Sequence, residues 1–568
     1  MIVSKLKSVI GSTLEKLSLP GAEIHIEHPE NIKNGDFTSN VALKHCGAFG
    51  MGANEFAEKI KDNLDFSAIP ELEKVEIAGP GFLNFYIKDE YFRAECAELY
   101  KEKIPGRGHS MEGQTALFEY TDPNPFKAFH IGHLMANAVG ETLSRLCEFQ
   151  GAHIKRICYQ GDIGLHVAKT IWAMQKARAG FPHDDDSIAD KIKFMGDAYV
   201  VGAHAYEDDE TAKSEIRAIN KKLFEKSDAD LEVYYKKGKE WSLLYFDKIY
   251  KKLDTRFDEF IFESEVVDLA KEIVTENLGF LFEESEGAVV FPGERFGLHT
   301  RVFLNSEGLP TYEAKELALF FTKSERHKFD LSVITSANEI SDYFKVLRRV
   351  MFLLHPDEAK KTKFIGHGML RFSDGKMSSR KGNIITGEEL LLEMEEKALK
   401  KMEERDMTPE KKKEVAEKIA VSAIKFSILR QSPGKDIVFD REKSMSFDGD
   451  SGPYLLYAGV RVASLLKKAA AEGIVPIYIG GERKVLFLEK LLCRFGAVAH
   501  RAFEEKSPNL LVEYLLRLTS EFNNFYAHNK IIDKDDKETA HRLALAHLFG
   551  RVLEQGLFLL GINIPEEM

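Results

Sequence analysis

The 568-residue sequence has no apolar run long enough to span a membrane, and its N-terminus lacks the charged-then-apolar pattern of a secretory signal. It contains only five cysteines, which are widely spaced and form no CxxC pair. This pattern argues against a disulfide scaffold and against a structural zinc site. We therefore expect a cytoplasmic protein with reduced thiols, no protein-bound metal and no membrane partner.

Positive charge is also in deficit, because the formal net charge is −12. Such a chain repels nucleic acid on average, so any RNA partner must bind through local basic surfaces. The composition, 44% hydrophobic and 30% charged, is typical of a soluble globular protein. At this length we expect several domains, each with its own core.

The most informative stretch runs from Glu119 to Phe149. A short apolar run at its start has the length of a strand, and Pro123 and Pro125 then interrupt regular pairing. From His133 onward, apolar residues recur at spacings of three and four, which predicts a helix. The sequence therefore predicts a strand, a loop and a helix that starts near residues 130–133.

The start of that predicted helix is suited to bind phosphate. Unpaired backbone N–H groups and the positive end of the helix dipole attract anions there. Gly132 leaves room for a base or a ribose to approach the backbone. His130 and His133 can donate hydrogen bonds to charge that develops on a phosphoryl group. The alternative is that both histidines simply cap or pack the end of the helix.

A second motif lies far along the chain, from Gly375 to Asn383, and Lys376 follows His130 by 246 residues (376 − 130). Its three cations and two hydroxyls between glycines suit a polyphosphate. On its own, the segment is more typical of a solvated loop. The residues expected to hold the phosphates are Lys376, Met377, Ser378 and Lys381.

Together the two motifs resemble the paired signatures of the class I aminoacyl-tRNA synthetases, the HIGH motif and the KMSKS loop. The more specific resemblance is to arginyl-tRNA synthetases, and it extends over essentially the whole chain. GDFTSNVAL (35–43) and VEIAGPGFLNFYI (75–87) resemble the additional N-terminal domain of that family, which contacts tRNA. The last residues, from Arg542 onward, resemble its anticodon-binding domain.

The resemblance implies an α/β protein with three domains. Residues 1–107 would form an α+β tRNA-contacting domain, and residues 108–436 a Rossmann-type catalytic domain with an insertion at about 176–263. Residues 437–568 would form an all-α helical bundle that binds the anticodon, and apolar periodicity favours helices there. Open parallel sheets bind ligands at the carboxyl ends of their strands, so the two motifs should meet at that edge.

The implied activity is that of an arginine–tRNA ligase. The carboxylate of L-arginine would attack the α-phosphate of ATP, pyrophosphate would leave, and the 3′-terminal ribose of the tRNA would then accept the arginyl group. Mg²⁺ would accompany ATP without a dedicated protein cage. The resemblance further implies that the first step requires bound tRNA. The expected partners are L-arginine, ATP and the tRNA for arginine, and the expected state is a monomer.

The resemblance also assigns individual residues. Lys127 fits a family lysine that compensates for the second lysine of KMSKS, which is Ser379 here. Tyr312 and Glu316 are one helical turn apart, where a carboxylate can match a guanidinium group, although the spacing alone also fits an exposed pair. The residues implied to bind L-arginine are Glu119, Asp122, Pro123, Asn124, His133, Tyr312 and Glu316.

Two further positions depart from the family pattern, since Ile340 replaces a glutamine and Ile163 replaces a tryptophan. In the terminal bundle, aromatic and basic side chains would stack on unpaired anticodon bases and bind phosphates, although core packing explains each aromatic residue as well. These residues are Tyr454, Tyr457, Arg461, Lys467, Phe525 and Tyr526.

Three other functions remain open at the level of sequence. A small-molecule nucleotidyltransferase also uses an HxGH loop but does not need the flanking domains. An RNA-binding relative of a synthetase would lose the loop residues, which are present here. Another class I synthetase, such as the cysteine enzyme, is expected to have metal-ligand cysteines. ATP–pyrophosphate exchange with each amino acid distinguishes these functions.

Overall fold

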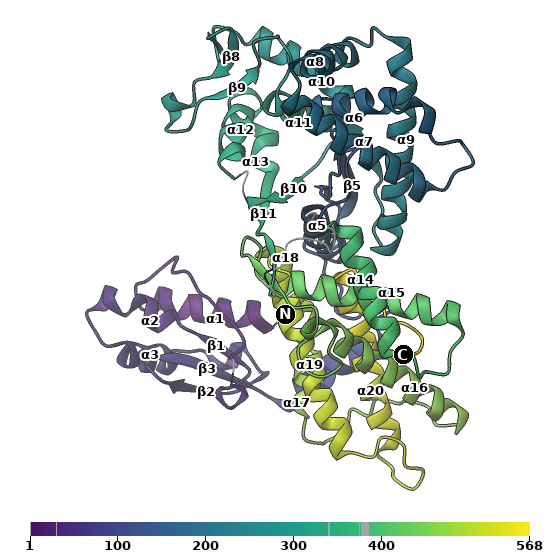
Figure 1. The fold of residues 1–568 in the computed structure, drawn as a ribbon. Helices are drawn as coiled ribbons and strands as arrows, with labels where there is room; N and C mark the ends of the chain where they lie inside the picture. Colours follow the sequence, from purple (N-terminus) through teal and green to yellow (C-terminus); the bar gives the residue numbers. More distant parts are fainter. Residues whose placement is uncertain (1, 30, 339–340, 374, 376–384) are drawn as a thin grey trace. The chain divides into compact units, whose positions relative to one another are not determined.

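The computed structural model describes residues 2–29, 31–338, 341–373, 375 and 385–568 (Figure 1). The chain divides into two compact units. Unit 1 comprises Met1–Lys103, Pro476–Arg494 and Ala540–Leu545. Unit 2 comprises Ile104–Val475, Phe495–Thr539 and Ala546–Met568.

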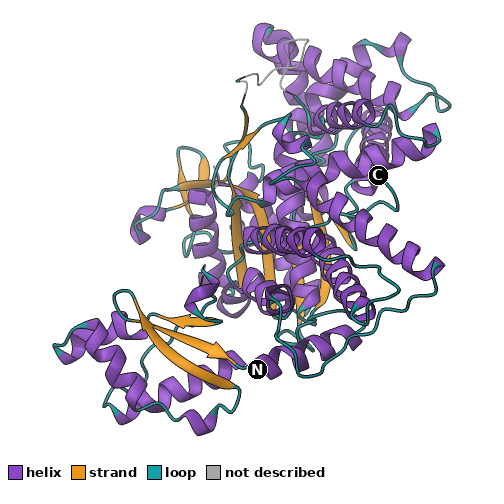
Figure 2. Cartoon of the chain, turned by 90° about the horizontal axis from the view of Figure 1, so that it is seen from below, coloured by secondary structure: helices purple, strands orange, loops and turns teal. Residues whose placement is uncertain are grey.

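Unit 1 is built on a three-stranded antiparallel sheet with the strand order β1-β3-β2, drawn in orange in Figure 2. Its strands are β1 (Phe37–Ser39), β2 (Leu72–Ala78) and β3 (Phe82–Ile87). Its helices are α1 (Ile2–Lys16), α2 (Val41–His45), α3 (Ala53–Asp62), α4 (Asp89–Lys101) and α17 (Phe487–Leu492). Gly79 and Gly81 both have positive φ in the tight turn between the antiparallel strands β2 and β3, a conformation that glycine adopts readily.

The second segment of unit 1 is held by buried, fully paired charges. Arg483 donates hydrogen bonds to both carboxylate oxygens of Glu489, at 2.6 and 2.8 Å, and the Tyr478 hydroxyl donates a third at 2.6 Å. Lys490 forms an ion pair with the buried Asp36 at 2.8 Å. The Lys490–Asp36 ion pair therefore joins residues that are 454 positions apart in the sequence within one compact unit.

Unit 2 contains a five-stranded sheet with the order β11-β10-β4-β5-β6, and every neighbouring pair is parallel. The strands are β4 (Thr115–Glu119), β5 (His153–Gln160), β6 (Glu259–Phe262), β10 (Leu331–Ala337) and β11 (Thr362–His367). The chain moves from β4 to β5 and β6 on one side and to β10 and β11 on the other. The strand order therefore reverses between β4 and β10, and the carboxyl edge there is where such sheets bind ligands.

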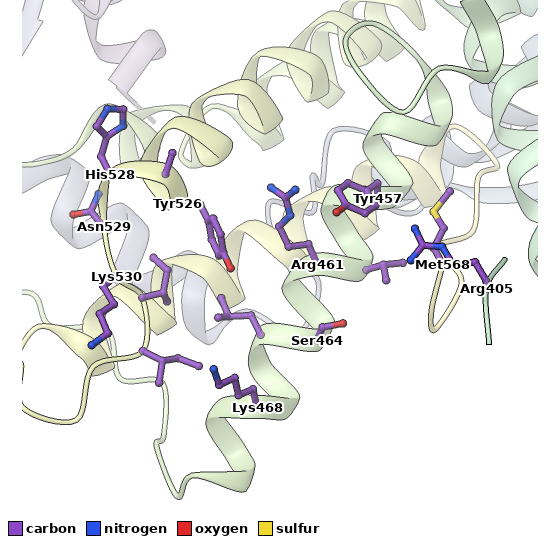
Figure 3. Close-up of a pocket in the computed structure, with 15 residues that line it drawn as sticks. Arg405, Tyr457, Arg461, Ser464, Lys468, Tyr526, His528, Asn529, Lys530 and Met568 are labelled. Carbon is purple, nitrogen blue, oxygen red and sulfur yellow. The ribbon is translucent and has the colours of Figure 1, made fainter. Parts of the chain in front are cut away.

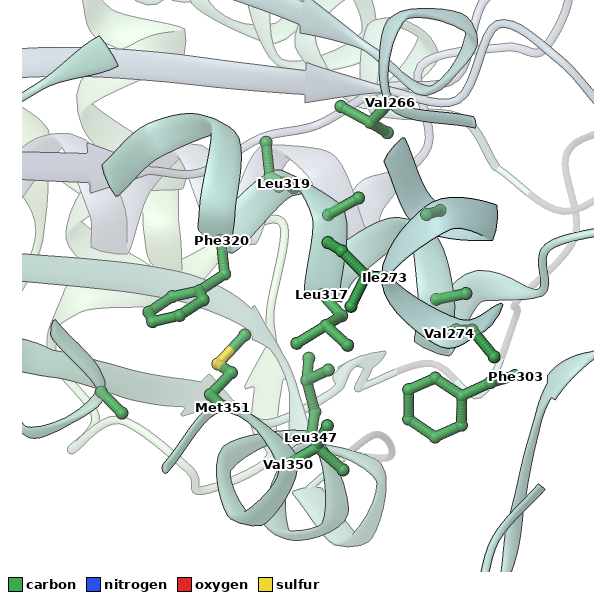
Figure 4. Packing of buried hydrophobic residues seen from close by; sticks show 14 of the residues in the cluster. Val266, Ile273, Val274, Phe303, Leu317, Leu319, Phe320, Leu347, Val350 and Met351 are labelled. Carbon is green, nitrogen blue, oxygen red and sulfur yellow. The ribbon is translucent and has the colours of Figure 1, made fainter. Parts of the chain in front are cut away.

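The sheet of unit 2 is packed against helices by one apolar cluster. Leu117 and Ile157 of the sheet belong to this cluster. So do Leu317 and Val350 of the helices, which Figure 4 labels. The helices concerned are α10 (Glu263–Glu276), α11 (Tyr312–Arg326) and α12 (Ser341–Leu354). Helix α5 (Ile131–Phe149) contacts β4, β5, β10 and β11. This arrangement confirms the predicted Rossmann-type α/β domain.

Four helices lie between β5 and β6: α6 (Leu165–Lys176), α7 (Ile188–Asp208), α8 (Glu210–Glu225) and α9 (Ala229–Lys252). They share their own apolar cluster, in which Ile163 is buried together with Trp241. A small antiparallel sheet follows, formed by β7 (Glu283–Ser285), β8 (Ala288–Phe291) and β9 (Arg301–Leu304). Ile163, the isoleucine that stands in the tryptophan position, is therefore a core residue of this helical cluster.

The remaining elements of unit 2 are mostly helical. They are α13 (Pro356–Lys361), β12 (Leu370–Phe372), α14 (Gly387–Lys401), α15 (Pro409–Leu429), β13 (Ile437–Phe439), α16 (Gly452–Ala471), α18 (Phe495–Glu504), α19 (Asn509–His528) and α20 (Thr539–Leu559), of which α20 also passes through unit 1. The predicted helical C-terminal region is confirmed. In the described part of the chain, no helix combines the length and apolar character that a membrane crossing requires.

Candidate functional site

The loop that follows β4 has an unusual backbone. Thr121, Asp122 and Phe126 have φ values of 81°, 44° and 67°, a region that residues other than glycine rarely adopt and that recurs at functional sites. The Asp122 carboxylate accepts a hydrogen bond from the Tyr159 backbone N–H at 2.8 Å. These features place the loop beside the end of β5, at the carboxyl edge of the sheet.

The next two residues, Pro123 and Asn124, also help to hold the loop at the carboxyl edge of the sheet. Pro123 is buried, and the side-chain oxygen of Asn124 accepts a hydrogen bond from the Gly161 backbone N–H at 3.1 Å. A Cβ atom on Gly161 would lie 2.5 Å from that oxygen, so only glycine allows this close approach. The predicted arginine-binding residues 122–124 are therefore also the residues that fix the loop.

His130 and His133 stack on each other at the start of α5, with 3.4 Å between ring centroids. Nδ1 of His130 accepts a hydrogen bond from the His133 backbone N–H at 3.4 Å, and Nδ1 of His133 accepts one from the His130 backbone N–H at 3.1 Å. A neutral imidazole whose Nδ1 accepts carries its proton on Nε2. The histidines thus cap the helix and still present two Nε2–H donors.

The same two rings are neutral at physiological pH. Burial, followed by the nearby Lys127, lowers the pKa of His130 to about 4. Burial and the adjoining His130 ring lower the pKa of His133 well below its usual value. Gly132 lies between them, and a Cβ there would approach the His130 ring to 3.0 Å. The glycine therefore allows the stacked arrangement.

The chain that follows the cationic segment returns to the histidine motif. Thr386 forms an antiparallel bridge with His130, and the Gly387 backbone N–H donates to the Phe129 carbonyl at 2.8 Å. The residues on the far side of the second motif therefore lie beside the first. Of the predicted residues, Lys376, Met377, Ser378 and Lys381 lie outside the described residues, as do Ser379 and Ile340.

Lys127 occupies the loop between β4 and α5. It is half-buried, burial lowers its pKa, and Glu263 acts in the opposite direction. Within the described residues it forms no ion pair. Its ammonium group is thus held near the two histidines with capacity for an anionic ligand.

Two buried ion pairs join α11 to the carboxyl edge of the sheet. Lys323 pairs with Glu119, the last residue of β4, and both side chains are at most 3% exposed. Lys315 pairs with Glu263, the first residue of α10, and both are at most 7% exposed. Each of these two lysines therefore already has a carboxylate partner within the protein.

Glu316 and Asp122 have no such cation. The Oε2 atom of Glu316 is buried and receives no hydrogen bond from a described residue. Burial, followed by the negative charge of Glu119, raises the pKa of Glu316 to about 8. Burial and Glu119 also raise the pKa of Asp122 well above its usual value. A site with these unsatisfied acids is prepared for a cation.

Tyr312 is the first residue of α11 and lies one helical turn before Glu316, as the spacing predicts. Its side chain is 60% exposed, and the Lys315 ammonium lies 4.7 Å from its ring centroid. The ring thus remains open to a ligand beside the unpaired carboxyl group.

Lys323, Lys315 and Glu263 were not among the residues predicted from the sequence. Lys323 follows Glu316 by seven residues, which places both on one helix face, and this spacing was a usable signal. Glu263 directly follows a strand of the sheet, where ligand-binding residues collect. Lys315 had no comparable signal.

The helical region contains a cavity of about 810 Å³ that basic and aromatic side chains line. Arg461 lies between Tyr457 and Tyr526 (Figure 3), with its guanidinium 4.8 and 5.5 Å from the two ring centroids. Lys468 and Lys530 line the same cavity. Three of the predicted tRNA-binding residues therefore come together around one hollow.

The other three predicted residues lie elsewhere. Phe525 is only 7% exposed and its ring packs against Phe522 in the core, so it offers no free face. The Tyr454 hydroxyl accepts a hydrogen bond from Asn523 at 2.8 Å. Lys467 is exposed and does not line the cavity. Apolar periodicity identifies a helix but does not separate core aromatics from those that reach a ligand.

The described residues contain no group of three or more His, Cys, Asp or Glu side chains arranged to hold a metal ion. All five cysteines are free thiols. The donors around the histidine motif are nitrogen atoms of imidazole and ammonium groups, which suit phosphate rather than Mg²⁺.

Family models match nearly the whole chain. The model for "tRNA synthetases class I (R), catalytic domain" matches residues 97–441. The model for "Arginyl tRNA synthetase N terminal domain" matches residues 4–87, and that for "DALR anticodon binding domain" matches residues 455–568.

Individual relatives agree with these models. The arginine–tRNA ligase of Treponema denticola is 30% identical over 100% of this chain and 98% of its own length. That of Clostridium kluyveri is 31% identical over 96% of both chains.

Two solved structures share the fold over the whole chain. The arginyl-tRNA synthetase of Thermus thermophilus has a TM-score of 0.82 at 24% identity, covering 100% of both chains. That of Plasmodium falciparum has a TM-score of 0.81 at 19% identity, covering 100% of this chain and 99% of its own. Because the matching models and relatives span all regions described above, this chain belongs to the arginyl-tRNA synthetase family.

Proposed function

We propose that the carboxyl edge of the five-stranded sheet is where this arginine–tRNA ligase carries out both of its reactions. The chain activates L-arginine with ATP, releasing pyrophosphate, and transfers the arginyl group to its tRNA. The observation that carries the residue assignment is the unpaired carboxyl group of Glu316, on the edge where Glu119 ends β4.

ATP binds at the start of α5 in this proposal. The Nε2–H groups of His130 and His133 donate to the α-phosphate as the arginine carboxylate attacks it in line, and the positive end of the α5 dipole adds to this field. Lys127 and the segment with Lys376, Met377, Ser378 and Lys381 hold the β- and γ-phosphates. Mg²⁺ enters with ATP, and phosphate and water oxygens supply its ligands.

L-Arginine binds with its guanidinium group toward Glu316 and Tyr312. The planar guanidinium matches a carboxylate bidentately and can stack on an exposed aromatic ring. Glu119 and His133 border the same site, while Asp122, Pro123 and Asn124 shape its loop. A substrate that lacks the cation leaves these acids unpaired, which costs several orders of magnitude in selectivity.

The tRNA is proposed to contact the cavity in the helical region through Tyr457, Arg461 and Tyr526. Aromatic rings and a guanidinium can stack on unpaired bases, and the neighbouring lysines can bind phosphates. Substituting alanine for Tyr457 should weaken tRNA affinity without changing the KM for L-arginine or ATP, as filter binding and kinetics can measure. Unchanged tRNA affinity would remove this cavity from the proposal.

The remaining proposals concern the domain bounds, the compartment, the oligomeric state and the requirement for tRNA. Residues 1–107 are the proposed tRNA-contacting domain, 108–436 the catalytic domain and 437–568 the anticodon-binding domain. The proposed compartment is the cytoplasm, consistent with five free thiols. The proposed state is a monomer, and the first reaction is proposed to require bound tRNA. Sedimentation and exchange assays with and without tRNA test the last two points.

The arginine site is tested by Glu316→Ala in ATP–pyrophosphate exchange with tRNA present. The KM for L-arginine should rise about 100-fold, because the guanidinium loses its charged partner, while the KM for ATP stays unchanged. Glu325→Ala, an exposed position on the same helix, is the matched control. If both Michaelis constants change equally, Glu316 has no specific role in holding the guanidinium.

The ATP site is tested by His130→Ala and Lys376→Ala. Each should reduce arginine-dependent exchange by about 100-fold or more, because charge on the α-phosphate or the pyrophosphate loses a donor. Full activity in both variants would show that these residues were misassigned.

A further inference from the structure

We propose that Glu316 holds a proton in the empty site and releases it when L-arginine binds, so that one proton leaves for each guanidinium that enters. This inference rests on the proposed role of Glu316 in binding L-arginine. It follows from a count of charges among buried side chains.

Carboxyl groups outnumber cations around Glu316. The groups that act on it come from every packed element: Glu119 from β4, Asp122 from the loop after it, Tyr159 from β5, Glu263 from α10, Lys315 and Lys323 from α11, and Tyr343 from α12. This set holds four carboxyl groups, counting Glu316, and two lysines.

Both lysines are already paired. Lys323 forms its ion pair with Glu119, and Lys315 forms its ion pair with Glu263. The remaining acids are Glu316 and Asp122. Neither has a cationic partner among the described residues, and the Asp122 carboxylate accepts only a backbone hydrogen bond.

An ionised carboxylate in this position would be unstable. The Oε2 atom of Glu316 is sealed from solvent and accepts no hydrogen bond from a described residue, so an ionised carboxylate would be only partly solvated and would lack a cationic partner. The ionised Glu119 nearby adds repulsion. The acid therefore keeps its proton at neutral pH, and a pKa of about 8 is consistent with this state.

A guanidinium group reverses this balance. It is permanently charged, so it brings a positive charge next to the acid and cannot lose it by deprotonation. The proton on Glu316 then leaves to solvent, and a carboxylate–guanidinium pair forms with bidentate geometry. The net charge of the site stays constant: one positive charge enters on the substrate and one leaves as a proton.

The sign of the pH dependence follows from linkage. Below about pH 8 the free site is protonated and the complex is not, so raising the pH favours the complex. The Kd for L-arginine should fall about tenfold per pH unit between pH 6 and 7.5, and should level off above pH 8. L-Citrulline is neutral and isosteric, and it should bind without releasing a proton.

The test is isothermal titration calorimetry of L-arginine into the full-length protein at pH 7, in buffers with different enthalpies of ionisation. The slope of the observed enthalpy against buffer enthalpy gives the number of protons released. The expected value is about one for the unmodified protein and for Glu325→Gln. For Glu316→Gln the value should fall close to zero, with weaker binding.

The outcomes separate this inference from the proposed function. If Glu316→Gln binds L-arginine with unchanged Kd, the proposed binding role fails. If that variant binds more weakly but the unmodified protein releases no proton, the coupling is wrong and the binding role stands. Proton release that persists in Glu316→Gln would overturn the assignment to Glu316. The pH dependence of the unmodified protein needs no variant and also tests the coupling if Glu316→Gln fails to fold.

Discussion

Glu489 in unit 1 and Glu316 in unit 2 are both carboxyl groups in packed surroundings, and they differ in how completely the chain satisfies them. Burial alone would raise the pKa of Glu489, but hydrogen bonds from Arg483 and Tyr478 lower it below its usual value. Glu316 has no such donors at Oε2, and burial raises its pKa to about 8.

This difference separates a structural acid from a ligand-binding one. Glu141 on α5 is a second example of the first kind, because Arg145 donates to it at 2.6 Å and the Tyr120 hydroxyl donates as well. A buried carboxyl group that other side chains of the protein fully pair supports the fold. A buried carboxyl group without such partners is available to bind a cationic ligand. Burial alone does not distinguish the two cases.

A large effect is expected at the structural acid. Glu489→Gln leaves the partly buried Arg483 without its counter-charge and should lower the free energy of unfolding by about 3 kcal/mol, measured by urea denaturation. The KM for L-arginine should stay unchanged. Glu482→Gln, an exposed neighbour, is the control. A loss below about 1 kcal/mol would contradict the structural role.

Removing a lysine should convert the paired Glu119 into an unpaired acid. Lys323→Met should lower the free energy of unfolding by about 3 kcal/mol, because the cation that balances Glu119 is lost. Saturating L-arginine should then raise the melting temperature more in this variant than in the unmodified protein, since the substrate replaces part of the missing charge. Equal shifts in differential scanning fluorimetry would argue against this substitution of charges.

Acid should destabilise the protein through histidines whose pKa values are lowered in the folded state. The folded-state pKa values of His130 and His166 are about 4 and 3, mainly because of burial, and lie below the usual value of 6.5. The unfolded chain therefore binds more protons between pH 6.5 and 4, so stability is lost as the pH falls. We expect a loss of about 1 kcal/mol per pH unit in urea denaturation. Constant stability across this range would contradict neutral histidines.

The smallest effect is a gain in stability. Glu316 has a folded-state pKa raised above its unfolded value, so its contribution is lost as the pH rises from 4.5 toward 8. Glu316→Gln removes this titration, so its free energy of unfolding in urea denaturation should exceed that of the unmodified protein at pH 8, and the difference should shrink toward pH 5. A difference that is independent of pH would show that the carboxyl group does not titrate there.

Much of the fold was predictable because the signals are local. The period of three and four residues identified α5, and apolar periodicity identified the helices of the C-terminal region. The spacing of Tyr312 and Glu316 placed both on one helix, and the resemblance to a family supplied their role.

Other features depend on distant contacts that no local pattern encodes. Glu119 and Lys323 are 204 residues apart, and each alone is an ordinary charged residue. Whether a buried glutamate is paired or unpaired depends on such contacts, so the proton count at Glu316 was not predictable. For the same reason, the sequence did not predict that residues 476–494 belong to unit 1.

That shared membership has an evolutionary consequence. Val485 and Cys493, from near the C-terminus, belong to the same apolar cluster as residues of α1 and α3, and α17 contacts α4. A gene that lost its first hundred codons would not encode a shorter enzyme with one module removed. It would encode a chain with an uncovered apolar segment, which is prone to aggregate.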